Sequence, residues 1–462
     1  MKRHKQVTNS YKNTKLIILY GIILLLVSCV KKNQVEDNLI SNIVPLPDIL
    51  TEIQDSDLSP IMDMIGDAKI IGVTEGTHYA NEPLDFRNEL IKFLVKKKRI
   101  DVVAIESGII ESKYIFDYVN GRKGNIDSIL YNGISWTFDK LPQNKELITW
   151  LRTYNADTTN SHKVKLYGFD VPGSPANPFA NRKMYTAITE ALLYLKVVDH
   201  DKWKEFESKL KPYIEFIHIN YFNANDKSNQ YIHLTETDRN NLTEIISDLI
   251  KLYEINELHY IKQSTKEDYE WAYLAANCSK QVDDFLRVTP LNYKIPLNIE
   301  ELYTTDFLFN QQSTRDLSMF ANFDWIIKRE HDPNILLFAA LRHLKKSPAT
   351  LKEKGTLKTF QIDDFGQFLS SKFEEEYKVI GNFYLNSIIE DDSTKVDNDA
   401  LENFLIHNNY KNYYKLITEA DKDFMNKEWK FGEDLFNLSF YMNPYNEVDI
   451  IFFNQIQTQI NL

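Results

Sequence analysis

Cysteine, glycine and proline are scarce in this sequence, and each shortage excludes a class of protein. The 462 residues include two cysteines, 14 glycines and 14 prolines. Two cysteines cannot build a disulfide framework. The low glycine and proline content excludes collagen-like and low-complexity chains. With 26 tyrosines and 27 phenylalanines, the sequence instead predicts a packed globular domain.

An excess of positive charge is also lacking. The formal net charge is −12, and loss of the basic residues near the N-terminus would make the mature chain about −17. Nucleic acids and anionic lipid surfaces attract proteins of the opposite charge. We therefore expect no nucleic-acid partner and no electrostatic attachment to a membrane.

Several common catalytic motifs are missing. No Gly-x-Ser-x-Gly sequence occurs, which argues against a serine hydrolase of the usual α/β type. Neither a His-Glu-x-x-His zinc motif nor a glycine-rich phosphate loop is present. Cys278 lies in a stretch of helical periodicity, where packing in the core is the expected role. We therefore expect no cofactor.

The N-terminus has the pattern of a lipoprotein signal. Five basic residues precede an apolar run over residues 16–27, which is too short to cross a bilayer. The run ends in Leu-Val-Ser-Cys29 and resembles a bacterial lipobox. We expect residues 1–28 to be removed, Cys29 to be lipidated, and residues 29–45 to form a flexible tether in the cell envelope. Val30, rather than aspartate, favours the outer membrane, with the lipid as the protein's one membrane contact. An ordinary secretion signal or an uncleaved helix is the alternative.

Apolar patterning predicts an α/β fold over residues 46–462. Residues 68–75 and 101–106 have the length and composition of buried strands, and a helical stretch between them begins near Pro83. This βαβ unit requires a parallel strand pair. Four further strands are expected, at residues 164–170, 334–340, 378–383 and 448–453. Residues from about 180 to 295 show helical periodicity, so we expect a central, largely parallel or mixed sheet flanked by helices, with a helical insertion.

Polar side chains follow the predicted strands where ligands bind in such sheets, beyond the strands' carboxyl ends. They are Glu75 and His78 after the first strand, Glu106 and Asp170 at the ends of the next two, and His343 after the fourth. A carboxylate beside an imidazole is a means of activating water, since the acid fixes the ring's tautomer while the other nitrogen accepts a proton.

Arg87 is expected on the second turn of the helix that follows, close enough to the same edge to hold a carboxylate ionised or to stabilise an oxyanion. Each of these residues taken singly also has a structural explanation, as a strand cap or a hydrogen-bonded histidine. A third interpretation is a metal site formed by Glu75, His78, Glu106 and His343.

These residues resemble the erythromycin esterase family. The resemblance lies in Ile-Gly-Val-Thr-Glu-Gly-Thr-His78, Arg87 and Ala-Ile-Glu-Ser-Gly108, and it continues in further stretches between residues 150 and 348. It implies hydrolysis of an ester, such as a macrolide lactone, by a water molecule activated by His78 without a covalent intermediate. In this scheme Glu75 would orient His78. Arg87 and Glu106 would shape the electrostatic field of the site, and His343 would bind or protonate the small-molecule substrate.

The chain departs from the family pattern at four positions. Where the family has Ala-His-Asn-x-His, this chain has Ala-Ala340-Leu-Arg-His343, so one histidine and the asparagine are missing. Thr74 and Tyr79 replace glycines that are common in the family. Two alternatives therefore accompany the esterase hypothesis: a lipid-anchored binding protein that has lost catalysis, and a metal-dependent hydrolase.

Overall fold

The computed structural model describes residues 42–173, 185–220, 225–227, 229–303, 305–389, 392–406 and 410–460. The predicted signal peptide, Cys29 and most of the tether lie outside these residues. Ile43–Pro45, at the end of the predicted tether, form strand β1 and pair with β10 (Asn412–Leu416). Within the described residues, no helix has the length and apolar character needed to span a bilayer.

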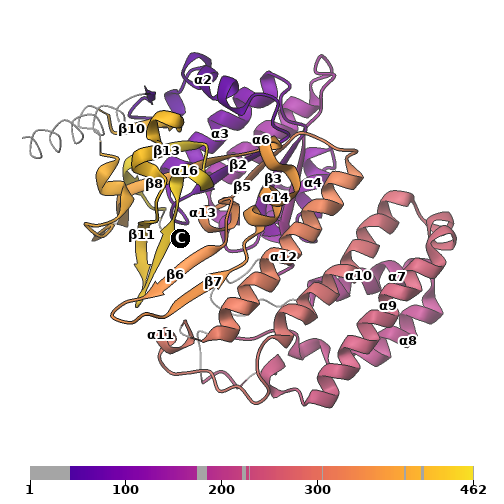
Figure 1. Cartoon of the computed structure of the whole chain (residues 1–462). Helices are drawn as coiled ribbons and strands as arrows, with labels where there is room; N and C mark the ends of the chain where they lie inside the picture. The colour runs from indigo at the N-terminus through magenta and orange to yellow at the C-terminus, as the bar shows by residue number, and fades with distance from the viewer. Residues whose placement is uncertain are drawn as a thin grey trace, which may run out of the picture.

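A mixed sheet forms the centre of the molecule (Figure 1). Its strand order is β1-β10-β13-β8-β2-β5-β3-β4, and the pairs from β13 to β4 are parallel. All six predicted strands are present in this sheet. They are β2 (Ile70–Glu75), β3 (Val102–Gly108), β4 (Lys165–Asp170), β5 (Ile335–Ala340), β8 (Tyr377–Ile389) and β13 (Ile450–Thr458), and β9 (Asp392–Lys395) pairs with β8.

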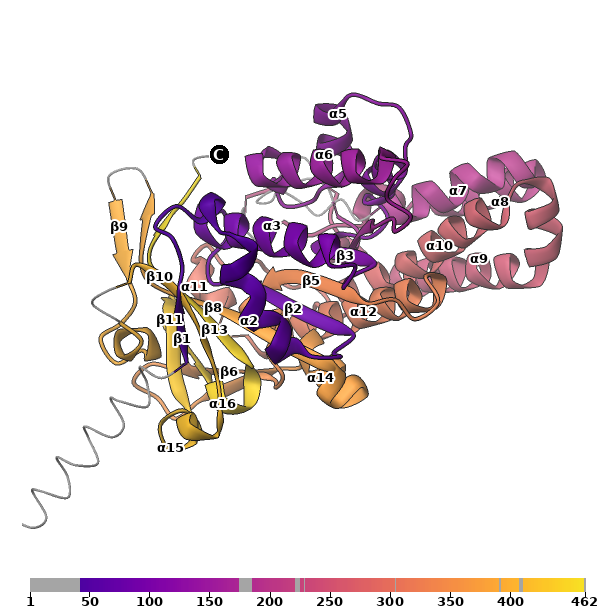
Figure 2. The same ribbon diagram turned by 90° about the horizontal axis from the view of Figure 1, so that it is seen from above.

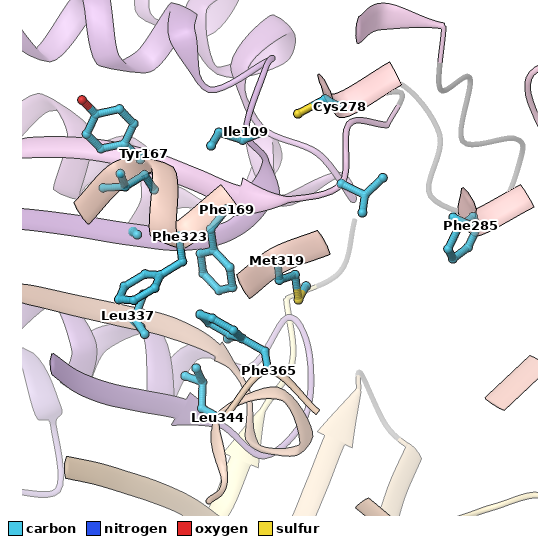
Figure 3. Close-up of a cluster of buried hydrophobic side chains, with 14 of the residues drawn as sticks. Ile109, Tyr167, Phe169, Cys278, Phe285, Met319, Phe323, Leu337, Leu344 and Phe365 are labelled. Carbon is cyan, nitrogen blue, oxygen red and sulfur yellow. The ribbon is translucent and has the colours of Figure 1, made fainter. Parts of the chain in front are cut away.

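Helices cover both faces of the sheet, which explains the nearly continuous apolar strands. Along β2, Ile71 and Val73 pack toward α3 (Asn81–Lys96) and α6 (Pro142–Ala156). From the other face, Leu337 of β5 packs against α12 (Asp306–Arg329) and α14 (Phe365–Phe373). Figure 2 shows the two helical layers, and Figure 3 shows the second core, where Phe169, Leu337, Met319, Phe323 and Phe365 lie together.

The long helices after β4 project from one side of the sheet (Figure 1). They are α7 (Thr186–Val198), α8 (His200–Leu210), α9 (Glu236–Gln263) and α10 (Lys266–Arg287), and α10 packs against α12. Cys278 of α10 is fully buried, which confirms its predicted place in the core. Shorter helices are α2 (Asp55–Ile65), α4 (Lys113–Val119), α5 (Ile126–Gly133), α11 (Ile299–Leu302), α13 (Leu341–Leu344), α15 (Lys422–Met425) and α16 (Pro444–Glu447).

A second, antiparallel sheet was not predicted. It has the order β11 (Trp429–Leu435), β12 (Leu438–Met442), β6 (Ala349–Glu353) and β7 (Thr359–Ile362). Its strands are short and half-buried, so each places only a few side chains in the core and leaves a weak apolar pattern in the sequence. All four strands of the second sheet come from the carboxyl half of the chain, and none of them supplies a predicted site residue.

Candidate active site

Glu75 and His78 form a hydrogen-bonded pair at the carboxyl end of β2. His78 Nδ1 lies 2.7 Å from Glu75 Oε1. The Glu75 side chain is 3% exposed and the His78 side chain 45% exposed. A carboxylate in this position binds the Nδ1–H tautomer, so Nε2 is the basic nitrogen. A buried acid thus orients a half-exposed imidazole, as activation of water requires.

The pair also changes the protonation of His78. Partial burial disfavours the imidazolium, but the carboxylates of Glu75 and Glu106 more than offset this and raise the pKa of His78 to about 9. The neutral, basic form therefore makes up about 1% of the molecules at pH 7. Any reaction that uses His78 as a base should accelerate as the pH rises toward 9.

Two left-handed backbone segments meet beside His78. Tyr79 has a φ of 65°, and Trp136 and Thr137 have φ values of 66° and 61°. The Tyr79 hydroxyl donates to the Trp136 carbonyl at 3.1 Å, and the rings of Tyr79 and His78 both contact Phe138. The positive φ explains why glycine would suit position 79. Here a tyrosine occupies the strained position, and its ring packs beside those of His78 and Phe138.

Arg315 of α12 binds the strand-end carboxylates to one another. Its Nε and Nη2 donate to the two oxygens of Asp170 at 2.9 and 2.7 Å, and Nη2 also donates to Glu106 at 2.7 Å. Glu106 accepts a further bond from the Ala340 amide at 3.0 Å. Burial favours the neutral acid, but His343 and Arg315 hold the pKa of Glu106 well below its usual range. Glu106 is therefore a stable anion near His78.

His343 is enclosed by polar partners. Its Nδ1 lies 2.6 Å from Asp316 Oδ1, and Arg315 Nη1 lies 3.1 Å from Nε2. The residue is 2% exposed, and burial together with Arg342 lowers its pKa. A neutral ring that donates to Asp316 and accepts from Arg315 satisfies both contacts. In this arrangement His343 positions Arg315, and neither of its nitrogens is directed to solvent.

Arg342 is held by two buried aspartates. Its Nη1 donates to Asp364 at 2.7 Å and to Asp316 at 3.3 Å, and its Nη2 lies 2.9 Å from Nε2 of His343. Burial raises the pKa of Asp364 to about 8 despite Arg342. Asp364 is therefore largely protonated at pH 7, and the charge of Arg342 balances that of Asp316, whose pKa is lowered by His343 and Arg342 despite its burial.

Arg87 is buried beside Phe338, in the layer between α3 and the sheet. It is 1% exposed, its Nε and Nη2 donate to Asn88 at 3.1 and 2.8 Å, and its guanidinium covers the Phe338 ring at 4.6 Å. Burial lowers its pKa to about 10, and Glu75 counteracts this. Its charge acts on Glu75 through space. Direct contact with an oxyanion, which the sequence suggested, does not fit this burial.

Comparisons with known proteins identify the family of this chain. A sequence model of the family described as erythromycin esterase matches residues 95–419, more than half of the chain. The chain belongs to the erythromycin esterase family. Glu106, Asp170, Arg315 and His343 lie within the match, whereas Glu75, His78 and Arg87 precede it. Assignment of the Glu75–His78 pair therefore rests on its geometry and on the motif resemblance.

Two Escherichia coli relatives are distant. Erythromycin esterase type I is 22% identical over 63% of this chain, and the match covers 65% of that protein, slightly less than two thirds of its length. Erythromycin esterase type II is also 22% identical, over 70% of this chain and 71% of that protein.

Solved structures share the fold of this family member. A Bacillus cereus protein superposes with a TM-score of 0.70 at 19% identity, covering 93% of this chain and 99% of its own. A structure described as a succinoglycan biosynthesis protein gives a TM-score of 0.68 at 18% identity over 93% and 98%. A mutant of erythromycin esterase EreC in its open conformation gives 0.63 at 16% identity over 89% and 97%.

The structure thus brings the expected residues of this erythromycin esterase family member to one end of the sheet. Arg315, which joins three of them, was missed as a site residue. Its signal is the Arg315-Asp316 pair, which lies within the stretches of family resemblance between residues 150 and 348. Within the described residues, no group of three or more His, Cys, Asp or Glu side chains is arranged to hold a metal ion.

Proposed function

We propose that this protein is an ester hydrolase in which His78, oriented by Glu75, activates water. The observation that carries the proposal is the 2.7 Å contact between a buried carboxylate and a half-exposed imidazole at the carboxyl end of a central strand. Membership of the erythromycin esterase family supports hydrolysis as the reaction class.

The chemistry follows from the tautomer. Nε2 of neutral His78 accepts a proton from water while the water oxygen bonds to the ester carbonyl carbon. Glu75 stabilises the imidazolium that forms. When the tetrahedral intermediate collapses, the carbonyl carbon–oxygen bond to the leaving group breaks, and His78 returns its proton to the alkoxide. The products are an acid and an alcohol, which remain one molecule when the ester is a lactone.

The other site residues support this pair in the proposed mechanism. Glu106 is a fixed anion that favours the imidazolium of His78. Arg315 and His343 hold Glu106 in place, and Arg87 places a positive charge near Glu75. None of these four supporting residues is more than 6% exposed, so their proposed role is electrostatic preorganisation.

The proposed substrate is a small ester, with macrolide lactones as the first candidates because two relatives are named erythromycin esterases. Lipidation at Cys29 would place the enzyme in the cell envelope, at the outer membrane. A binding protein without catalysis is the second candidate, and Ala340 favours it because alanine cannot transfer a proton.

A product-mass experiment tests the proposal. The mature chain from residue 30 is incubated at pH 7 and pH 9 with macrolides and activated esters, and products are followed by liquid chromatography and mass spectrometry. We expect a gain of one water, faster at pH 9, lost in His78→Asn and unchanged by a chelator. Loss of activity with the chelator would support the metal-dependent alternative. Tight macrolide binding without turnover would support the binding protein.

A further inference from the structure

The pairing between β2 and β8 changes character just before Glu75. The parallel register runs from Ile70 opposite Tyr377 to Val73 opposite Ile380. Beyond this point, side chains replace the backbone ladder. The backbone N–H of Asn382 donates to Thr74 Oγ1 at 2.8 Å, and the backbone N–H of Gly76 donates to the side-chain oxygen Oδ1 of Asn382 at 3.0 Å. Side-chain bonds to Asn382 therefore fix the backbone on both sides of Glu75.

Asn382 begins a chain of buried amides that crosses the sheet. Its Nδ2 donates to Asn454 Oδ1 at 2.8 Å, and Asn454 Nδ2 donates to Asn412 Oδ1 at 3.0 Å. Asn412 Nδ2 ends the chain on the Pro47 carbonyl at 3.1 Å. Gln457 Nε2 donates to Asn382 Oδ1 at 2.7 Å. These amides are at most 4% exposed. A connected buried network of this kind favours one arrangement, because each broken link leaves a further polar group unpaired. Within the described residues, only Gln457 Oε1 of these four amides has no hydrogen-bond partner.

Neighbouring contacts prevent the loop from moving independently of β8 and β13. A Cβ on Gly76 would lie 2.7 Å from Tyr384 Cδ1, so the Tyr384 ring packs directly on the loop backbone. Gln459 Nε2 donates to Thr77 Oγ1 at 3.2 Å, and the Ile460 N–H donates to the Tyr79 carbonyl at 2.8 Å. Asn382 binds Gly76, the residue next to Glu75, through a side chain that is itself held by Asn454 and Gln457.

We infer that Asn382 is a positioning residue: its carboxamide holds the Gly76 N–H and its backbone N–H holds Thr74 Oγ1, and the two bonds together direct the Glu75 carboxylate onto His78. The inference rests on the proposed function only for its effect on catalysis. Its effect on the Glu75–His78 contact is independent of any substrate. Losing the Gly76 acceptor removes the hydrogen bond that holds the peptide after Glu75, so this peptide can shift within the remaining loop contacts. A longer carboxylate–imidazole distance weakens both the hydrogen bond and the Coulomb attraction.

Asn382→Ala tests the inference, and Asn412→Ala is the matched control. Both changes truncate a buried asparagine of the same chain, but Asn412 lies two links away from the loop. With the mature chain labelled at histidine, the imidazole of His78 is titrated by NMR. We expect Asn382→Ala to lower the pKa of His78 by at least about one unit. The kcat of hydrolysis should fall about 10- to 100-fold, while KM stays within about twofold. A loss of this size is typical when a group that orients a metal-ligating histidine by hydrogen bonding is removed, and Asn382 orients its pair in a comparable way.

The control separates positioning from folding. Asn412→Ala should lower the thermal midpoint but leave the His78 titration and kcat unchanged. If Asn382→Ala does not fold, Thr74→Val removes the other acceptor without changing side-chain size, and Thr74→Ser should rescue the His78 titration relative to valine. A shifted His78 titration supports the inference even if no ester is hydrolysed. An unchanged titration in a folded Asn382→Ala or Thr74→Val protein overturns it, even if wild type is an active esterase.

Discussion

Replacing Glu75 with glutamine should make His78 much less basic. Glutamine keeps the size of the side chain and can still accept the hydrogen bond from Nδ1, but it removes the negative charge 2.7 Å from the ring. The Coulomb attraction of Glu75, which helps raise the pKa of His78 to about 9, then disappears and the hydrogen bond to a neutral oxygen weakens, while burial continues to lower the pKa. The pKa should therefore move toward the ordinary value of about 6.5.

The protonation state at a working pH shows the size of this effect. At pH 7.5, a pKa of about 9 leaves about 97% of His78 protonated, whereas a pKa of about 6.5 leaves about 9%. Because the His78 side chain is 45% exposed, solvent screening weakens the attraction, so we expect a measured drop of at least about one unit.

Histidine-labelled protein titrated by NMR between pH 5 and 10 measures this drop. In the same variant, the rise of kcat/KM should move to lower pH while its plateau falls, because the imidazolium formed during the reaction has lost its counterion. Glu111→Gln is the control, since Glu111 is also buried but is not among the groups that act on His78. A Glu75→Gln protein with the wild-type His78 titration would refute the electrostatic reasoning.

Three further predictions concern stability and the loop. The pKa of His78 is higher in the folded state than the ordinary unfolded value, so its contribution to stability is complete below pH about 6.5 and is lost as the pH rises through 9; thermal unfolding should show this decline in wild type and less of it in His78→Asn. Arg315→Met leaves Asp170 and Glu106 without their shared cation and should cost about 3–5 kcal/mol in denaturant unfolding, and a loss below 1 kcal/mol would contradict its structural role. Tyr79→Gly relieves about 1 kcal/mol of backbone strain but loses a hydrogen bond of similar worth, so stability should change little while KM rises, and an unchanged KM would remove Tyr79 from the substrate wall.

The central strands could be predicted because parallel strands covered on both faces have continuous apolar sequences. Polar residues at their ends then indicated the site, and Glu75, His78, Glu106 and His343 do lie at that end of the sheet. The second sheet could not be predicted in the same way, since β7 buries only Phe360 and Ile362.

Local sequence spacing says little about contacts between distant segments. Arg315 meets Asp170 across 145 positions and Glu106 across 209, so its place in the site depends on how α12 packs on the sheet. The contact of His343 with Arg315 also joins segments 28 positions apart, so it could not be predicted from the local sequence. Asn382 lies inside a strand that the sequence predicted, but its bond to Gly76 appears only when β8 is placed beside β2.

Attack by water activated at His78 is most directly tested by a single turnover in H₂¹⁸O, with the protein in excess over its best ester substrate. Mass spectrometry follows both the product and the intact protein through the time course. We predict one ¹⁸O atom in the product acid, no acyl adduct on the protein at any time, and no labelled product with His78→Asn. A transient protein mass increase equal to the acyl group, or labelled product formed at the wild-type rate by His78→Asn, would contradict this mechanism.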